Sequence, residues 1–194
     1  MNKILFTAAL AASVVAPATA QAQALPGAIV AVADVDRVTA ECNACKTAVA
    51  ALRSQATTLQ AREKALADPL AAEQKSIQTA IDALGGKEPD AALKTRVTQW
   101  QTRQQNAATE LQRSQQQLQR NQQYIQQQVA TKLGPIYQQV MQRRGANILV
   151  DTNATLAVAN SVDVTNDVLA ALNAALPSIA TTAPAQTQTT PQSR

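Results

Sequence analysis

Two long apolar stripes separated by a glycine pair constrain this chain more than any other feature. From Val38 to Leu84, mostly apolar or small residues step alternately by four and three, and a second stripe with steps of three, four or seven runs from Leu93 to Val140. Such steps are typical of helices that pack along a seam. The breakers Gly85-Gly86 and Pro89 lie between the stripes and predict a chain reversal. The sequence therefore predicts one helical hairpin over residues 38–144, with its tip near 85–89.

The length of the stripes determines what kind of hairpin this is. At about 1.5 Å per residue, each limb would be on the order of 70 to 80 Å long, several times the span of a compact domain of this size. Trp100, Tyr124 and Tyr137 are the only aromatic residues after Phe6, and they would fill a globular core poorly. We therefore expect a mainly α fold with a small β body, in which a long antiparallel coiled-coil hairpin projects as an arm.

Three features of the limbs test this expectation. Pro69 predicts a kink at which Asp68 caps a restarted helix, and Gly134-Pro135 predicts a second bend. Residues 112–128 contain ten glutamines, a composition that is also found in disordered tracts. Because apolar residues recur every seven positions through this run and glutamine is a good helix former, helix is the favoured interpretation.

The first residues have the pattern of an export signal. A basic start, an apolar run of twelve residues and Ala18-Thr19-Ala20 predict a secretory signal peptide over residues 1–20. Its end could also fall as late as residue 24. No other stretch approaches the length of a membrane span. We expect a soluble exported protein.

The segments on either side of the hairpin predict a small β body over residues 28–37 and 145–175. A strand is expected within residues 28–35, followed by Asp36 or Thr39 as the cap of the first limb. Two further strands, 147–151 and 156–159, should form a hairpin, and a short helix should begin with Thr165 as its N-cap. Residues 177–194 are rich in Thr, Gln, Pro and Ala without periodicity, which predicts a disordered tail.

A body of roughly forty residues with open sheet edges rarely supports itself. Self-association through the strands is the economical solution. The candidate residues for these contacts are apolar positions of the predicted strands: Ile29, Val30, Val32, Ile148, Val150, Leu156 and Val158.

The return limb is strongly basic. Between residues 91 and 144 there are eight basic residues against Glu110 alone. Such an excess of positive charge predicts a negatively charged or weakly held partner. The alternative is that these residues only form the solvated flank of a coiled coil, as charged residues on such helices usually do. The candidate binding residues are Lys94, Arg96, Arg103, Arg113, Arg120 and Lys132.

The sequence lacks residues for most catalytic and metal sites. It contains no histidine and only two cysteines, which excludes His-dependent triads and zinc sites built from His and Cys clusters. Cys42 and Cys45 have the spacing of dithiol oxidoreductases, but both fall on the seam of a helix, so packing or a structural disulfide is the favoured interpretation. Asp34, Asp36, Asp151, Asp163 and Asp167 are interpreted as caps and surface residues. We expect no enzyme, cofactor or metal.

The strand-to-arm junction and the C-terminal segment carry a family resemblance. Val-Ala-Asp-Val-Asp (32–36) leads into the arm, and Leu149-Val150-Asp151 and Asp163-Val164-Thr165 follow it within the segments 147–159 and 162–172. Together with the export signal, this pattern resembles the OmpH/Skp family of periplasmic chaperones over nearly the whole chain except the tail. The resemblance implies a trimer with three helical arms around a cavity that holds unfolded outer-membrane proteins without ATP.

Three functional hypotheses follow. A periplasmic holdase for unfolded outer-membrane β-barrel proteins is the first, and an envelope coiled-coil scaffold without chaperone activity is the alternative. A basic nucleic-acid or anionic-lipid binder is the third, and contact with anionic lipid or lipopolysaccharide is compatible with the basic limb. Nucleic acid is disfavoured as a partner because the protein is expected to be exported and because the arm has few aromatic residues for base stacking.

Overall fold

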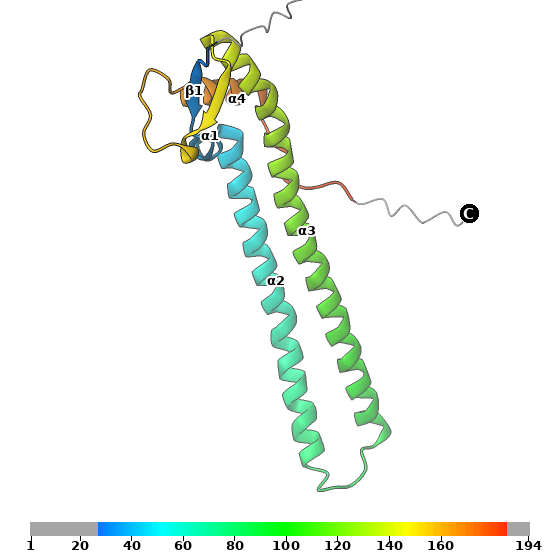
Figure 1. The fold of residues 1–194 in the computed structure, drawn as a ribbon. Coiled ribbons are helices and arrows are strands. Elements are labelled where there is room, and N and C mark those ends of the chain that lie inside the picture. Colours follow the sequence, from blue (N-terminus) through cyan, green and yellow to red (C-terminus); the bar gives the residue numbers. More distant parts are fainter. Residues whose placement is uncertain (1–26, 186–194) are drawn as a thin grey trace, which may run out of the picture.

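The computed structural model describes residues 27–185, and the predicted signal peptide lies outside them. Figure 1 shows two long helices side by side, projecting from a small body. In chain order the elements are β1 (Val30–Ala33), α1 (Val35–Glu41), α2 (Asn43–Asp82), α3 (Ala91–Arg144), β2 (Ile148–Asp151), the 3-10 turn η1 (Thr152–Ala154) and α4 (Thr165–Ala175). We call α2, α3 and the loop between them the arm.

The arm reverses at the predicted place. Gly85 and Gly86 have φ angles of 56° and 87°, a left-handed conformation that glycine adopts without steric cost. Asp90 then caps α3, its side chain accepting a 2.8 Å hydrogen bond from the amide of Leu93. Pro89 lies just before this cap and not in the first helical turn. The loop is short because these residues turn the chain without any further element.

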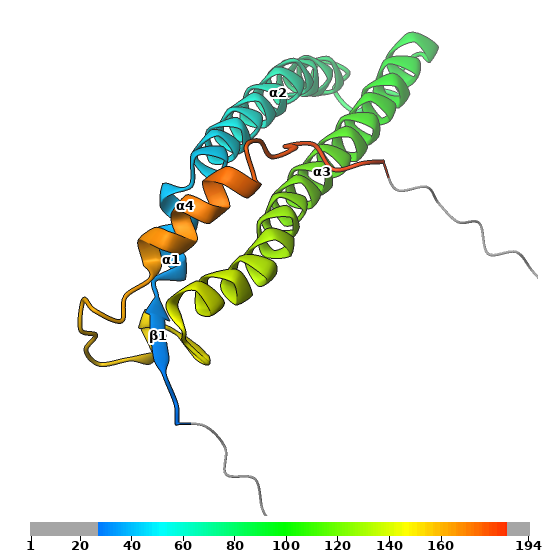
Figure 2. The ribbon, with the colours of Figure 1, turned by 90° about the horizontal axis from the view of Figure 1, so that it is seen from above.

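Both prolines lie inside uninterrupted helices. The predicted restart at Asp68 is wrong, because α2 continues through Pro69, and the Asp68 carboxylate accepts a 2.7 Å hydrogen bond from Lys64 Nζ. An internal proline removes one helical hydrogen bond, but Pro69 is exposed, so water can bond the freed carbonyl. α3 likewise continues through Pro135, and Figure 2 shows it curving as it approaches the body. The glutamine-rich tract 112–128 is helical, as predicted.

The sheet of the body differs from the prediction. β1 and β2 are parallel, with Val30 opposite Ile148 and Ala33 opposite Asp151. On the other side of β1, the Val32 amide donates to the Val162 carbonyl (2.9 Å) and the Val32 carbonyl accepts from the Val164 amide (2.8 Å). The predicted hairpin of 147–151 with 156–159 is wrong.

The reason is the turn after β2. The Asp151 carboxylate accepts a hydrogen bond from the Asn153 amide (2.9 Å), and η1 leads the chain away from the sheet. Leu156, predicted to lie in a strand, is fully exposed. The chain returns to the sheet only at residues 162–164, so the third extended segment pairs with β1 and not with β2.

Hydrogen bonds at the helix starts tie the body together. Asp34 caps α1 in place of the expected Asp36 or Thr39, accepting from the Arg37 amide at 2.7 Å. Thr165 is the first residue of α4 and not its cap. Its hydroxyl accepts from the Asp34 amide (2.9 Å) and donates to the Asp163 carboxylate (2.5 Å), which links the starts of α1 and α4. The Thr165 hydroxyl and the Thr165 amide both donate to the Asp163 carboxylate, and these two bonds hold the pKa of Asp163 below its usual value.

The core of the body includes the start of α2 and the end of α3, which meet at the base of the arm. Val38 of α1, Val140 of α3, and Val168 and Leu172 of α4 are fully buried in one cluster. Burying one such side chain contributes about 1.5 to 3 kcal/mol. The body is therefore larger than the segments 28–37 and 145–175 alone, because the first turns of α2 and the last turns of α3 belong to the same core.

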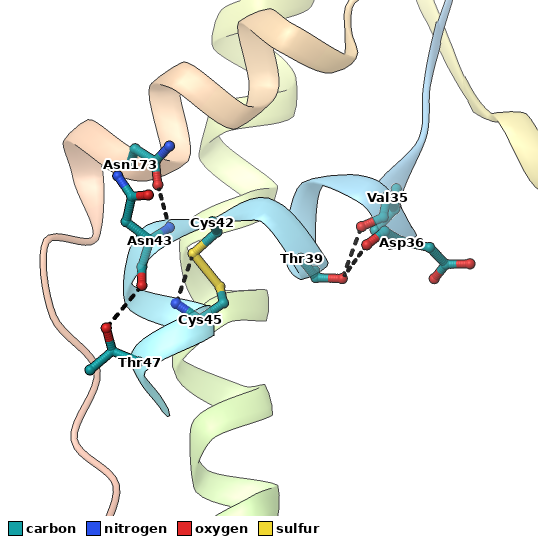
Figure 3. Close-up of a disulfide and its surroundings, with 8 residues drawn as sticks. All are labelled: Val35, Asp36, Thr39, Cys42, Asn43, Cys45, Thr47 and Asn173. Atoms are coloured by element: carbon teal, nitrogen blue, oxygen red, sulfur yellow. Dashed lines mark hydrogen bonds between the residues drawn. A yellow bond between two sulfur atoms is a disulfide. The ribbon is translucent and has the colours of Figure 1, made fainter. Parts of the chain in front are cut away.

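A disulfide lies where α1 meets α2. Cys42 and Cys45 are joined by the disulfide, and Cys42 has a non-helical backbone conformation (φ -56°, ψ 129°) that separates the two helices. Its sulfur accepts from the Cys45 amide at 3.1 Å, and the Asn173 side chain of α4 accepts from the Asn43 amide at 2.8 Å (Figure 3). Both sulfur-bearing residues are buried. The pair thus caps α2 and fixes the direction in which the arm leaves the body.

The segment after α4 is ordered beyond the predicted limit. Residues 177–185, which we call the tail segment, form no helix or strand, yet they lie against the arm and hydrogen-bond to it. Ile179 packs against the core cluster. The disorder predicted from Pro177 is therefore wrong for residues 177–185, and residues 186–194 lie outside the described part of the chain.

Removing the disulfide should loosen the junction between body and arm. We predict that Cys42→Ala with Cys45→Ala lowers the free energy of unfolding by about 2 kcal/mol, because closing even a short loop restricts the unfolded chain. Urea unfolding at one fixed protein concentration measures this. Wild-type protein under reducing conditions is the control and should lose a similar amount, while an unchanged urea midpoint for both would contradict the structural role.

Candidate functional site

The seam between α2 and α3 is only partly closed. Between Ala48 and Ile77, no residue of α2 is fully buried. The predicted seam residues Leu52, Ala56, Leu59, Leu66 and Leu70 are half-buried. Val49, also predicted to face the partner helix, is 63% exposed. The arm therefore presents accessible apolar surface along its length.

Ion pairs across the seam replace part of the missing apolar contact. Arg96 donates to Glu73 at 2.6 Å, and Arg62 donates to Glu110 at 2.6 Å. Hydrogen bonding to these guanidinium groups lowers the pKa of both carboxyl groups, and the pKa of Arg62 is raised by Glu110. Each pair is partly exposed, so its contribution is small. The pairs mainly fix which residues of the two helices face each other.

The six predicted basic residues do not form one cluster. They are spread over α3 from residue 94 to residue 132, about 57 Å of helix. Lys94 and Arg103 line the same shallow hollow of about 650 Å³ on α3. Lys94 pairs with Glu88 and Arg96 with Glu73, so these two are partly neutralised. Among the described residues, Arg103, Arg113, Arg120 and Lys132 have no acidic partner within 4 Å.

Sequence reasoning missed an apolar groove where the arm joins the body. It is a hollow of about 450 Å³, lined chiefly by Cys45, Val49, Ile125, Val129 and Leu133. Val49, which the heptad pattern assigned to the seam, lines this groove and is 63% exposed. The pattern gives the spacing of the apolar residues but not how closely the two helices approach each other.

A set of amide side chains was also missed. The Asn121 side chain is buried in the seam and donates to Gln55 Oε1 of α2 at 2.8 Å. With Gln117 and Gln128 of α3, these residues contact the tail segment. A signal was present in the sequence: Asn121 lies in the seam between Leu118 and Ile125, at a position where an apolar residue is expected.

The residues predicted to mediate self-association differ in their exposure to solvent. Ile29, Val30 and Ile148 are exposed at 56%, 42% and 41%, and Leu156 is exposed in the loop after η1. Val150 and Val158 are half-buried. Val32 is buried inside the body, where both of its main-chain groups are paired, so it is not available for a contact with another copy.

The described residues, 27–185, contain neither a metal-binding cluster nor a membrane-spanning helix. No group of three or more His, Cys, Asp and Glu residues is placed so that it could hold a metal ion. No helix in this range is both long and apolar enough to cross a membrane.

Comparison with known proteins identifies the family. Residues 29–172 match the family model described as outer membrane protein (OmpH-like), which is about three quarters of the chain. The chain belongs to the OmpH-like family. Membership of this family supports a chaperone role for the protein in general terms. No relative among curated proteins matches the chain.

A solved structure supports the fold of this OmpH-like chain. The crystal structure of a protein from Caulobacter crescentus, assigned as an OmpH-like outer membrane chaperone, aligns with a TM-score of 0.69 and 23% sequence identity. The alignment covers 86% of this chain and 95% of that one. At this identity the likeness concerns the fold.

The ion pairs of the seam should make the arm sensitive to acid. The pKa values of Glu73 and Glu110 are lower in the folded protein than in the unfolded chain, where a glutamate titrates near about 4.3. Their stabilisation is therefore present above that pH and is lost as the pH falls through the lower folded values. We predict that Glu73→Gln with Glu110→Gln lowers the melting temperature on the order of 2 °C at pH 7 and less at pH 3.

Thermal unfolding followed by circular dichroism at low salt measures this difference. Glu63→Gln is the matched control, because Glu63 is exposed on α2 and makes no ion pair among the described residues. An equal loss at both pH values would show that the ionised carboxylates contribute nothing.

Proposed function

We propose that this protein is an exported, ATP-independent holdase of the periplasm that binds unfolded outer-membrane β-barrel proteins along its arms and prevents their aggregation. The observation that carries the proposal is the unpaired positive charge of α3. Arg103, Arg113, Arg120 and Lys132 extend over about 44 Å of helix and have no acidic partner within 4 Å among the described residues.

The physical argument combines this charge with the open seam. An unfolded outer-membrane protein alternates apolar and polar residues, so it can contact a basic, partly apolar surface at many points. Each exposed contact is weak, but several arms acting together can hold a chain through a high effective concentration. The apolar groove at the base of the arm offers a further contact for apolar side chains.

A homotrimer is the assembly that we propose for this function, with the number three taken from the family resemblance. The support from the fold is the outer edge of β2, which pairs with no strand among the described residues, and the exposed side chains of Val30 and Ile148 on the neighbouring strands β1 and β2. An exposed apolar sheet edge is unstable against association with another strand. Pairing between copies would cover it.

The holdase proposal is tested with a fluorescently labelled, unfolded outer-membrane β-barrel protein. The wild-type protein should suppress aggregation of this client without nucleotide, and its affinity should fall as salt is raised, because screening shortens the range of the attraction to roughly 8 Å or less. We predict that Arg103→Glu, Arg113→Glu and Lys132→Glu together weaken client binding on the order of tenfold at low salt. These residues were chosen because Arg96 holds Glu73 and Arg120 holds Gln117.

The matched control places the same charge change on α2. Lys46, Arg53 and Lys75 are exposed and have no acidic partner among the described residues, and their reversal to Glu should weaken binding less. Equal losses would show that only net charge matters. Absence of aggregation suppression by the wild type would favour the envelope scaffold.

Assembly is tested by measuring mass. We predict that Val30→Asp with Ile148→Asp converts the trimer to monomers at micromolar concentration, because charges on side chains that association covers are costly to bury. Native mass spectrometry gives the result. Ile81→Asp is the control, since Ile81 is 40% exposed near the tip, far along the chain from the body. A monomeric wild type would refute the assembly.

A further inference from the structure

The tail segment occupies a defined place on the arm. Figure 2 shows it passing from the end of α4 across the space between α2 and α3 and on past α3. Its contacts come from both helices: Gln55 of α2, and Gln117, Asn121 and Gln128 of α3. We call the surface formed by these four side chains the amide groove.

The amide groove binds the main chain of the tail segment. The Gln128 carboxamide bonds both main-chain groups of Ala180, accepting from its amide (3.0 Å) and donating to its carbonyl (2.9 Å). This two-point pairing has the pattern that neighbouring strands use in a sheet. The main chain is common to every polypeptide, so such pairing is largely independent of sequence.

Ala183 and Thr181 are held in the same way. The Asn121 side chain accepts from the Ala183 amide at 2.8 Å, and Gln117 lies 3.4 Å from the Ala183 carbonyl as a donor. Gln55 donates to the Thr181 carbonyl at 3.1 Å. All five bonds end on main-chain atoms of the tail segment.

A chain of hydrogen bonds orients three of these four amides. Arg120 donates to Gln117, Gln117 donates to Asn121 (2.7 Å), and Asn121 donates to Gln55 (2.8 Å). In each of these bonds an N–H group donates to the side-chain oxygen of the next residue. The Gln55 amide N–H therefore remains available as a donor, and the Asn121 oxygen as an acceptor, for the tail segment. Networks of this kind fix side-chain orientation more firmly than single bonds do.

The groove continues beyond the tail segment. A hollow of about 330 Å³ includes Gln55, Gln117 and Asn121 and extends to Leu59, Arg62 and Leu118. Apart from Ile179, the described tail offers mainly small side chains, and each bond contributes only about 1 kcal/mol net. The occupant is therefore weakly held, and an extended chain with longer apolar side chains could use more of the same surface.

We propose that the amide groove is a binding site for the main chain of extended segments of unfolded protein, and that the tail segment occupies it until a client displaces it. This inference rests on the proposed holdase function and names the site on each arm. The tail acts as an internal competitor, since its tether keeps it at high effective concentration. Displacement then requires a client that contacts the arm at several points.

The test releases the tail segment without removing it. Ala180→Pro with Ala183→Pro removes the two N–H donors whose hydrogen bonds Gln128 and Asn121 accept, and leaves the Ile179 side chain unchanged in the sequence. Ala180→Ser with Ala183→Ser is the control, because it keeps both protons. If the free tail fills the groove about 80% of the time, the proline variant should bind the unfolded, labelled outer-membrane β-barrel protein about fivefold more tightly than the wild type, and the serine variant should not change.

A second pair of variants tests whether the gain in client affinity arises at the amide groove. Gln128→Ala added to the proline variant should abolish the increase, whereas Gln127→Ala, an exposed neighbour on the same helix, should preserve it. Circular dichroism and native mass confirm that each variant is folded and assembled. An unchanged affinity of the proline variant, or a gain that survives Gln128→Ala, would overturn the proposal.

A peptide titration separates this inference from the holdase function. A synthetic peptide with the sequence of residues 177–194 is titrated into a chain that ends at Leu176. Binding should be weakened by proline at peptide positions 180 and 183 and kept by serine there. If no variant binds the client, both the holdase function and the proposed role of the groove in client binding are refuted. The peptide titration then still shows whether the groove binds the main chain of an extended segment. If the client binds but not more tightly on tail release, only the present inference fails.

Discussion

The rest of the structure depends on the burial of one apolar cluster at the base of the arm. Val38, Val140, Val168 and Leu172 come from α1, α3 and α4 and are all fully buried. Burial on this scale is the main favourable term for a small body, because the long arm encloses little apolar surface of its own. The disulfide and the Thr165 hydrogen bonds then fix the directions in which α1, α2 and α4 leave the cluster.

Charge is distributed unevenly between the arm and the body. Residues 43–144 carry fourteen basic and seven acidic residues, whereas the described remainder carries Arg37 against six acidic residues. The whole-chain charge of +4 conceals this separation. Under the proposed function, an acidic client would be attracted to the arm and repelled from the body. Asn121 and Gln55 lie within this basic arm. Their side chains form directed hydrogen bonds, which purely apolar side chains could not form.

Weak packing and binding capacity have the same physical origin in the arm. A tightly closed seam would bury the apolar residues and amides that a client contacts under the proposed function. Here α2 is fully buried only near its two ends, and ion pairs align its middle with α3. The amides that a closed seam would have hidden bind the tail segment instead. The arm can therefore be ordered as two helices and still offer surface to an extended chain.

The sequence by itself determined the two long helices, their reversal at Gly85-Gly86, the helical state of the glutamine-rich tract and the OmpH-like family. The helices, the reversal and the helical tract follow from local periodicity and turn chemistry, which act over a few residues. The family rests instead on the resemblance of residues 32–36 and of the C-terminal segment. The basic residues of α3 could be named from composition, but their pairing could not, because Glu73 and Glu110 face Arg96 and Arg62 only after the helices are aligned.

Only the tertiary structure decided the remaining features. The parallel pairing of β1 with β2 and with residues 162–164 depends on long-range contacts. Residues 156–159 have a strand-like pattern but pair with no strand in the described part of the chain. Helix α2 passes through Pro69 because the lost hydrogen bond can be replaced by water at an exposed position. The tail segment has a disordered composition, yet its main chain is bound by Gln55, Asn121 and Gln128. Composition describes side chains, and it carries no information on a main chain that another part of the fold binds.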